Sequence, residues 1–203
     1  MRTKIQVISS TAVPLPIEHI DTDQIIPARF LKATSREGFG KNLFRDWRYS
    51  NDDEKQPNQD FVLNDAKFSG RILLAGKNFG CGSSREHAAW AIKDYGFDVV
   101  ISSFFADIFR NNALNNFLLP VQVTEETLAT LMQLVLHHPS TEITVDLPAQ
   151  SIKTADGKVN SGFDISPYKK ICLLNGYDDI DYLLSMRDVI SSFEQASHKT
   201  FAA

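Results

Sequence analysis

Residues 76–89 hold the side chains best placed to do chemistry, two serine hydroxyls and an arginine beside a glycine-rich loop. Glycine lets a backbone turn sharply or approach a ligand closely. Ser83 and Glu86 have the spacing of a capping box, so the pattern predicts a helix with Ser83 as its N-cap, a role worth about 1 kcal/mol. The free amide groups and positive dipole end of such a helix favour a bound anion. Arg85 would add a planar pair of donors for a carboxylate or phosphate.

The same residues also have a purely structural interpretation. Capping boxes are common, and a glycine loop before a helix can serve only as a turn. A ligand site is favoured because the glycines, Ser83, Ser84 and Arg85 all converge on one helix start. Both interpretations stay open at this point.

The elements that must position this loop follow from the apolar pattern around it. Residues 72–75 form a short apolar run that predicts a buried strand. Helix formers follow the loop, Gly96 offers a stop, and residues 98–102 predict a second strand. A strand, a helix and a strand within about thirty residues make a right-handed βαβ unit, with the loop at the carboxyl edge of the first strand. The sequence therefore predicts an α/β fold built on this unit.

Charged residues ahead of this unit are further candidates. Asp21 and Asp23 stand close together, and two buried carboxylates would repel, so one should be exposed or both should face a cation or donor. An Asx turn or a helix cap explains them equally well. Arg36 lies just ahead of two glycines, a position that can present a side chain on a loop. A solvated surface charge is the alternative for that arginine.

The rest of the chain predicts a single domain, residues 1–203, without an internal repeat or a dividing linker. A strand at 4–8 should end before Pro14 and Pro16, the polar stretch 51–60 should be a mobile loop, and the tail 196–203 should fray. The helix at 106–116 carries four asparagines, which suggests polar contacts. Further helices are predicted at 124–138, 167–174, 178–185 and 187–195, and further strands at 118–123, 142–146, 151–154 and 159–164. The fold class is thus an α/β core with an added β-hairpin and C-terminal helices.

Composition argues against several classes of function. A net charge of −4 and a pI of about 5.7 give no electrostatic basis for binding nucleic acid or a membrane surface. The two cysteines, Cys81 and Cys172, are too few to hold an iron–sulfur cluster or a structural zinc ion alone. The sequence predicts neither a signal peptide nor a transmembrane helix. We therefore expect a cytoplasmic protein with reduced thiols.

Residues 79–89 (Phe-Gly-Cys-Gly-Ser-Ser-Arg-Glu-His-Ala-Ala) resemble the signature of the swivelling domain of aconitase-type hydro-lyases. Supporting matches lie at 21–32, at 38–40 with 43–44, and at 172–176, so the resemblance covers most of the chain. Within that family, the chain resembles the stand-alone domains that form the small subunits of 3-isopropylmalate dehydratases in leucine biosynthesis. The resemblance implies a swivelling β/β/α domain.

The resemblance also implies a lyase that converts 2-isopropylmalate to 3-isopropylmalate by removing water and adding it back. It places a [4Fe–4S] cluster on a separate large subunit, held there by three cysteines, and no metal on this chain. The expected partners are that large subunit and a dicarboxylate substrate. Small subunits of homoaconitase- or methylmalate-type dehydratases share these motifs and are an alternative. A phosphate- or nucleotide-binding module is another, although the loop lacks Gly-Lys-Ser/Thr and lacks Gly-x-Gly-x-x-Gly with an acidic partner.

By resemblance, the site consists of a base, an aspartate and donors for the substrate. Ser83 is the catalytic base, acting as an alkoxide that the helix N-terminus and Arg85 favour. Asp23 is the catalytic aspartate. Ser84 and Arg85 bind the substrate.

Other residues would complete the pocket. Arg36 would hold a substrate carboxylate, with Arg29 as the competing candidate. The isopropyl group needs an apolar wall, which predicts a contact with Phe30 or Leu31 unless both belong to the core. His87 is expected to be a packed or capping residue rather than a catalytic one.

Overall fold

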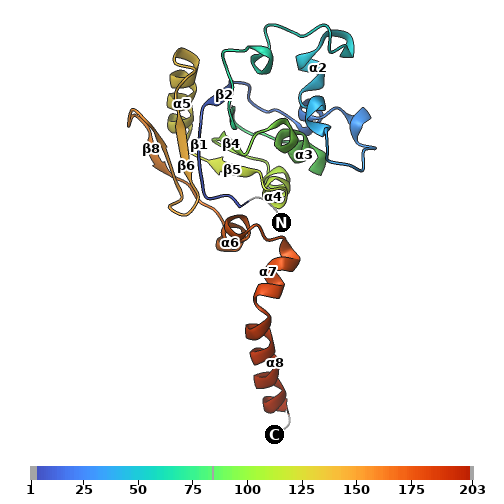
Figure 1. Cartoon of the computed structure of the whole chain (residues 1–203), viewed down its shortest axis with the longest axis vertical. Coiled ribbons are helices and arrows are strands. Elements are labelled where there is room, and N and C mark those ends of the chain that lie inside the picture. The colour runs from blue at the N-terminus through green and yellow to red at the C-terminus, as the bar shows by residue number, and fades with distance from the viewer. Residues whose placement is uncertain (1–3, 84, 202–203) are drawn as a thin grey trace.

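The computed structural model describes residues 4–83 and 85–201 and arranges them as two sheets with helices around them (Figure 1). The strands are β1 (Val7–Ser10), β2 (Ala12–Leu15), β3 (Ile72–Ala75), β4 (Val99–Ser102), β5 (Leu119–Gln122), β6 (Ile143–Asp146), β7 (Ser151–Thr154) and β8 (Asn160–Gly162). The α-helices are α1 (Thr22–Ile25), α2 (Arg45–Arg48), α3 (Glu86–Tyr95), α4 (Asp107–Asn115), α5 (Glu125–His137), α6 (Pro167–Asn175), α7 (Asp179–Ser185) and α8 (Arg187–Phe201). Short 3-10 helices lie between α1 and β3, namely η1 (Ala28–Phe30), η2 (Phe39–Asn42), η3 (Ser50–Asp52) and η4 (Val62–Asn64).

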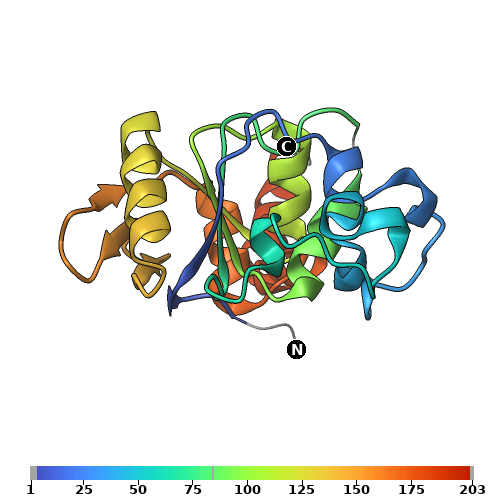
Figure 2. The same cartoon turned by 90° about the horizontal axis from the view of Figure 1, so that it is seen from above.

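The parallel sheet has the strand order β2-β3-β4-β5 and forms the centre of the core. Its inner strands, β3 and β4, are fully buried apolar runs, as expected where both faces of a parallel sheet are covered. Because α3 connects these two parallel neighbours, the predicted βαβ unit is confirmed. Figure 2 shows α5 and the second sheet on one side of the parallel sheet, and α3 and α4 on the other.

Proline lies in both edge strands of this sheet. Pro14 is in β2 and Pro120 is in β5, the two ends of the strand order. Leu15 O accepts from Gly76 N at 3.2 Å, so the polar groups of Leu15 face β3 and those of Pro14 face the open edge. A missing N–H costs no ladder hydrogen bond on that side. The first strand, β1, does end before Pro14, at Ser10, but Pro14 itself lies within β2 and so does not mark the end of strand structure.

The second sheet is antiparallel and has the order β1-β6-β7-β8. Three of its strands are the predicted ones that follow α5, with Gly157 in the left-handed region (φ +73°) between β7 and β8. The remaining strand is β1, where Ser9 Oγ lies 2.8 Å from Thr144 Oγ1 although 135 positions separate them. The sequence predicted the added strands but not this long-range partner.

The polar stretch 51–60, predicted as a mobile loop, makes specific side-chain contacts. Arg45 donates to Asp52 Oδ1 and to Glu54 Oε1, each at 2.5 Å. Asn58 N donates to Arg48 O at 2.8 Å. These contacts are polar, so the absence of apolar periodicity did not indicate them. The mobility of this loop stays a prediction.

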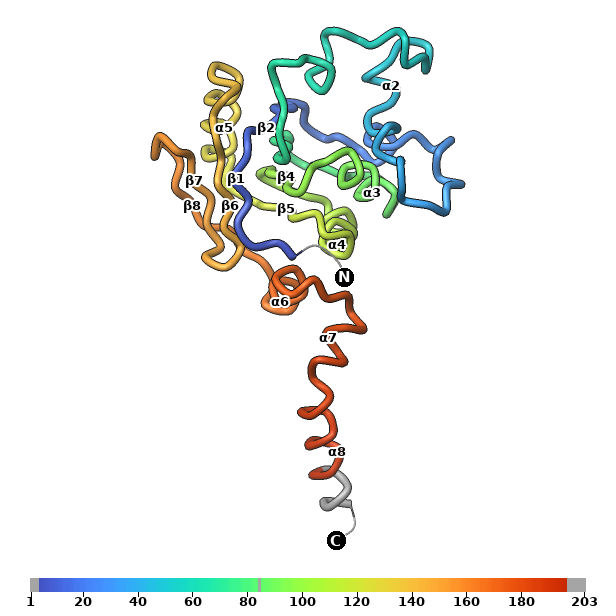
Figure 3. Tube along the Cα trace, in the orientation of Figure 1, coloured from blue at the N-terminus to red at the C-terminus, as the bar shows by residue number. Residues whose placement is uncertain are grey.

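The C-terminal helices lead away from the sheets (Figure 3). α6 buries Cys172 and Leu173 and ends at Gly176, which adopts the left-handed conformation usual for a glycine that ends a helix (φ 72°). The tail expected to fray from residue 196 is helical as far as Phe201. Among the helices of the described ranges, none combines the length and apolar character needed to cross a membrane.

Gly40 shows how closely η2 approaches α3. A Cβ at this position would lie 2.3 Å from the backbone N of Tyr95, and Gly40 N donates to Asp94 Oδ2 at 2.7 Å. We expect Gly40→Ala to lower the free energy of unfolding by about 3 kcal/mol, because two backbone segments must move apart.

Gly38→Ala is the matched control for this substitution. No atom lies within 4 Å of a Cβ there, and the positive φ (+68°) is the remaining source of strain. The expected loss is about 1 kcal/mol. Urea unfolding compares the two variants, and equal losses would contradict the close approach of η2 to α3.

Candidate functional site

Two loops far apart in the sequence run side by side at the carboxyl edge of the parallel sheet, one after β2 and one after β3. Gly80 N donates to Ile20 O at 2.8 Å, and Thr22 N donates to Cys81 O at 2.9 Å. The buried side chain of Thr22 also donates from Oγ1 to Ser83 O at 2.8 Å. The two motifs from which the site was predicted are therefore brought together.

Glycine is required in the second loop because its backbone is left-handed and closely packed. Gly80 has a φ of +76°, and a Cβ there would lie 2.2 Å from Cγ of Phe109. Gly82 has a φ of +86°, and a Cβ there would lie 3.3 Å from Cβ of Asp21. Residues with a side chain rarely adopt such φ values. The loop can therefore pass close to both α4 and the loop after β2.

The helix that follows this loop begins later than predicted. α3 starts at Glu86, and its N-cap is Arg85, which makes no side-chain capping hydrogen bond. Ser83 is exposed and precedes the N-cap by two positions, and its carbonyl oxygen accepts from Thr22 Oγ1 and from Arg85 N. The capping box predicted from Ser83 and Glu86 is therefore wrong. Ser84, the other predicted serine, lies outside the described residues.

The carboxylate of Glu86 binds side chains from three elements. Its Oε1 accepts from Trp90 Nε1 at 3.1 Å and from Asn116 Nδ2 at 2.9 Å, and Arg36 Nη2 lies 3.3 Å away. Burial acts to raise the pKa of this carboxyl, but the hydrogen bonds from Asn116 and Trp90 and the charge of Arg36 outweigh it and lower the pKa. Sequence reasoning missed this role, although the asparagine-rich end of α4 indicated polar contacts. Glu86 ties α3 to the end of α4 and to the segment ahead of η2.

The two aspartates of the first loop have separate roles. Asp21 is the N-cap of α1, where its carboxylate accepts from Gln24 N and the Gln24 side chain accepts from Asp21 N. Asp23, half exposed, forms an ion pair with Arg85. Each of the two interpretations left open by the sequence thus applies to one residue, a helix cap for Asp21 and a cationic partner for Asp23.

The two candidate arginines also differ in their partners. Arg36 pairs with the single carboxylate of Glu86, at the start of α3. Arg29 lies 2.5 Å from Asp46 and 3.3 Å from Asp52, which together neutralise it. Because Arg36 contacts the residue that follows Arg85, it is the better placed of the two to reach an anion at the start of α3.

The other predicted residues pack around the site. Phe30 and Leu31 are half-buried and lie against the core. His87 packs against Phe39 and Trp90, with ring centroids 5.7 and 4.4 Å away. This is the packed histidine that was expected. Phe30 and Leu31 pack against the core and keep part of their surface accessible, so a contact with substrate stays a prediction.

The donor set of this chain does not fit an iron–sulfur cluster. No group of three or more metal-binding side chains lies together within residues 4–83 and 85–201. Cys81 is half-buried in the glycine loop and donates from Sγ to His19 O at 3.4 Å, while Cys172 is buried in α6. Burial raises the pKa of both thiols, which disfavours the thiolate that iron requires.

Comparisons with known proteins agree with this architecture. The family model of the aconitase C-terminal domain matches residues 3–126, and the LeuD_N model matches residues 129–167. The 3-isopropylmalate dehydratase small subunit of Cytophaga hutchinsonii is 60% identical over 194 residues, which are 96% of this chain and 96% of that protein. The protein of the same name from Christiangramia forsetii is 60% identical over 95% of this chain and 93% of that one. The crystal structure of 3-isopropylmalate dehydratase (leuD) from Methanocaldococcus jannaschii shares 25% identity and a TM-score of 0.62, covering 93% of this chain and 99% of that chain.

The match to the aconitase C-terminal domain spans the βαβ unit and both site loops, so the class of the protein is an aconitase-type domain of a hydro-lyase. Relatives that are 60% identical over nearly the whole chain narrow this class. The chain belongs to the 3-isopropylmalate dehydratase small-subunit family of leucine biosynthesis, as its resemblance predicted.

Because Ser83 is not the N-cap of α3, its hydroxyl should contribute little to stability. We expect Ser83→Ala to change the free energy of unfolding by less than about 0.5 kcal/mol. Thr124 provides the matched control, since its side chain caps α5 by accepting from Thr127 N at 3.1 Å. Thr124→Ala should cost about 1 kcal/mol in chemical denaturation. A loss of similar size for Ser83→Ala would restore the capping interpretation.

Proposed function

We propose that this chain is the small subunit of a two-chain hydro-lyase that isomerises 2-isopropylmalate to 3-isopropylmalate by dehydration and rehydration. The observation that carries the proposal is the convergence of Asp23, Ser83 and Arg85 at the start of α3. The names of relatives at 60% identity support this substrate. Ser83 is exposed and Asp23 half exposed, which suits a site that a second chain completes.

Arg85 is the proposed anchor for a substrate carboxylate. Its side chain is 17% exposed, whereas that of its partner Asp23 is 53% exposed. A substrate carboxylate can therefore replace Asp23 on the guanidinium while Asp23 turns toward water or toward the substrate. The N-terminus of α3, where Arg85 makes no side-chain cap, favours the same negative charge. Arg36 offers a second guanidinium if Glu86 is exchanged for the other substrate carboxylate.

Ser83 is the proposed base for the proton on the carbon beside a carboxylate. A serine hydroxyl ordinarily keeps its proton at neutral pH, but the positive end of α3 and the nearby Arg85 favour the alkoxide. When Ser83 Oγ takes the carbon-bound proton, negative charge moves onto the substrate carboxylate, where the guanidinium stabilises it. The reverse transfer returns the proton on rehydration. Ser84 keeps the substrate-binding role that the resemblance implies.

The leaving hydroxyl group needs a Lewis acid, which we assign to a [4Fe–4S] cluster held by three cysteines of the large subunit. Cys81 and Cys172 lie on separate elements with raised pKa values, so neither is suited to bind iron. Both thiols are free, which agrees with the reducing cytoplasm, where we place the enzyme.

Phe30 and Leu31 are the proposed apolar wall for the isopropyl group. Leu31 directly follows η1, which contains Phe30, and both side chains are half-buried against the core. They are thus held in place and keep an accessible part. A carboxylate in place of the isopropyl group would lose water there without gaining a partner. That contrast favours isopropylmalate over the more acidic substrates of related dehydratases.

The roles of Ser83 and Arg85 predict a loss of turnover in an intact fold. Assembled with the large subunit, Ser83→Ala should lower kcat by about 10²–10⁴-fold, the usual contribution of a positioned base. Arg85→Lys keeps the charge but loses the planar pair of donors, so it should raise KM and lower kcat together. The measurement is anaerobic turnover of 2-isopropylmalate by the complex of the two separately purified chains.

Ser161→Ala, on β8 of the second sheet, is the control and should leave both constants unchanged. Near-normal rates for Ser83→Ala would remove the serine from the role of base. Robust turnover by this chain without any large subunit would contradict the two-chain enzyme.

The assignment of the apolar wall predicts a change in substrate choice. Leu31→Arg should lower the ratio of kcat/KM for 2-isopropylmalate to kcat/KM for an analogue with a carboxylate in place of the isopropyl group. Both constants come from one preparation, so a partly inactive variant does not disturb their ratio. Leu31→Met conserves volume and apolar character and should leave the ratio unchanged. An unchanged ratio in Leu31→Arg would move the specificity pocket elsewhere.

A further inference from the structure

Large apolar side chains on α7 and α8 are between 40% and 71% exposed. They recur at spacings of three or four positions within each helix, so each set shares one helix face. The residues are Ile180, Leu183, Leu184, Val189, Ile190 and Phe193. We call α7 and α8 together the C-terminal arm.

The C-terminal arm runs away from the two sheets, whereas α6 stays against them (Figures 1 and 3). By contrast, α3 and α5 bury most of their apolar residues in the core. A helix of this kind draws most of its stability in water from burying its apolar face. We therefore expect a binding partner to cover the apolar face of the arm.

Charge argues against a second copy of this chain as the occupant. Residues 178–203 contain five acidic side chains and two basic ones. The arm therefore carries a net negative charge, most of it at the start of α7, and packing two such arms together would bring like net charges close, which is unfavourable. A different chain with an apolar groove bordered by lysine or arginine would complement both properties.

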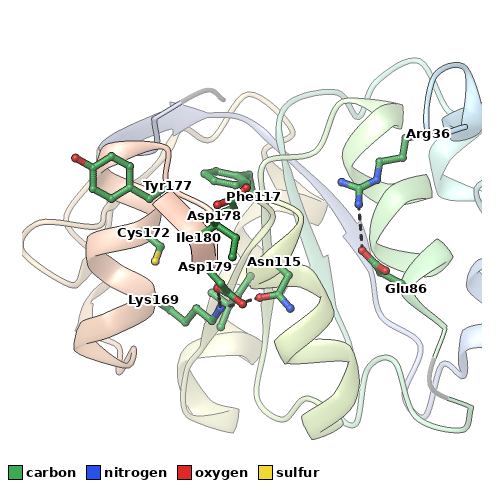
Figure 4. Close-up of a pocket in the computed structure, with 11 residues that line it drawn as sticks. Arg36, Glu86, Asn115, Phe117, Lys169, Cys172, Tyr177, Asp178, Asp179 and Ile180 are labelled. Carbon is green, nitrogen blue, oxygen red and sulfur yellow. Dashed lines mark hydrogen bonds and ion pairs between the residues drawn. The ribbon is translucent and has the colours of Figure 1, made fainter. Parts of the chain in front are cut away.

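The base of the arm adjoins the candidate site. A cavity of about 290 Å³ separates α3 from the segment that joins α6 to α7. Figure 4 shows Arg36 and Glu86 on one side of it, and Lys169 and residues 177–180 on the other. Glu86 directly follows Arg85 at the start of α3, and Arg36 reaches Glu86 from the segment ahead of η2. A partner that covers this helix start can therefore continue across the cavity onto the arm.

We propose that the C-terminal arm is the docking element for the cluster-bearing large subunit, which should offer an apolar groove with a basic border. This inference rests on the proposed function, which supplies the partner. The arm would hold the large subunit through a helix face that takes no part in the chemistry. The loops at 20–23 and 80–83 would then remain available to the substrate.

The test measures binding and turnover with separately purified large subunit under anaerobic conditions. Leu184→Lys and Phe193→Lys each place a charge on the apolar face, and these side chains are 64% and 71% exposed, so the variants should fold. We expect each to weaken binding by about thirtyfold, the loss typical of an interface hot spot. The large-subunit concentration for half-maximal turnover should rise by the same factor, while the plateau rate stays unchanged. Val7→Lys, on β1 and 54% exposed, is the matched control and should change neither quantity.

The outcomes separate the docking role from the proposed function. Unchanged affinity in both arm variants would overturn the docking role, and normal turnover by the wild-type complex would leave the proposed function standing. A dimer of the isolated chain that either variant converts to a monomer would assign the arm to a second copy instead. A two-chain complex that the variants weaken, but that does not turn over 2-isopropylmalate, would support docking and contradict the proposed function. No complex with the wild-type chain would overturn both.

Discussion

The backbone pairing between the loops after β2 and β3 is the constraint on which the candidate site depends. Because β2 and β3 are parallel neighbours, both loops leave the sheet at the same edge. Hydrogen bonds between residues 20–22 and 80–83 then fix their separation. The two loops can approach because Gly80 and Gly82 adopt left-handed backbone conformations. At Gly80, the neighbouring side chain of Phe109 also leaves no room for a Cβ atom. Asp23, Ser83 and Arg85 acquire their relative positions from this pairing.

Two arginines near the start of α3 are each paired with a carboxylate. Arg85 is held by Asp23, and Arg36 is held by Glu86, so each guanidinium is ordered and neutralised before any substrate arrives. Glu86 has two further donors, Trp90 Nε1 and Asn116 Nδ2, and remains satisfied if Arg36 leaves it. Exchange of one carboxylate for another therefore costs less than desolvating a free arginine would. If the candidate site binds a dicarboxylate, as we propose, both guanidinium groups are already ordered by a carboxylate.

The two sheets and the C-terminal arm have different roles: the sheets support the candidate site, and the arm leaves a surface exposed. The parallel sheet, covered by α5 on one side and by α3 and α4 on the other, carries both site loops (Figure 2). The antiparallel sheet pairs the N-terminal strand β1 with β6, although these two strands are far apart in the sequence. The C-terminal arm instead leaves its apolar face exposed. An exposed proposed base, Ser83, and an exposed helical arm are what we expect of a domain that works together with a second chain.

The sequence by itself determined the elements whose signals are local. The apolar runs of β3 and β4 and the stop at Gly96 each depend on residues within a few positions of one another, so pattern alone predicted them. Resemblance added the family and the candidate residues. Only the tertiary structure decided which partner each group takes. Glu86 had the spacing of a capping box with Ser83, but its carboxylate accepts hydrogen bonds from Asn116 and Arg36, which lie 30 and 50 positions away. The N-cap of α3 is Arg85 instead. Once folding brings distant side chains together, they can form the same hydrogen bonds as local ones. A pattern of neighbouring residues does not contain this information.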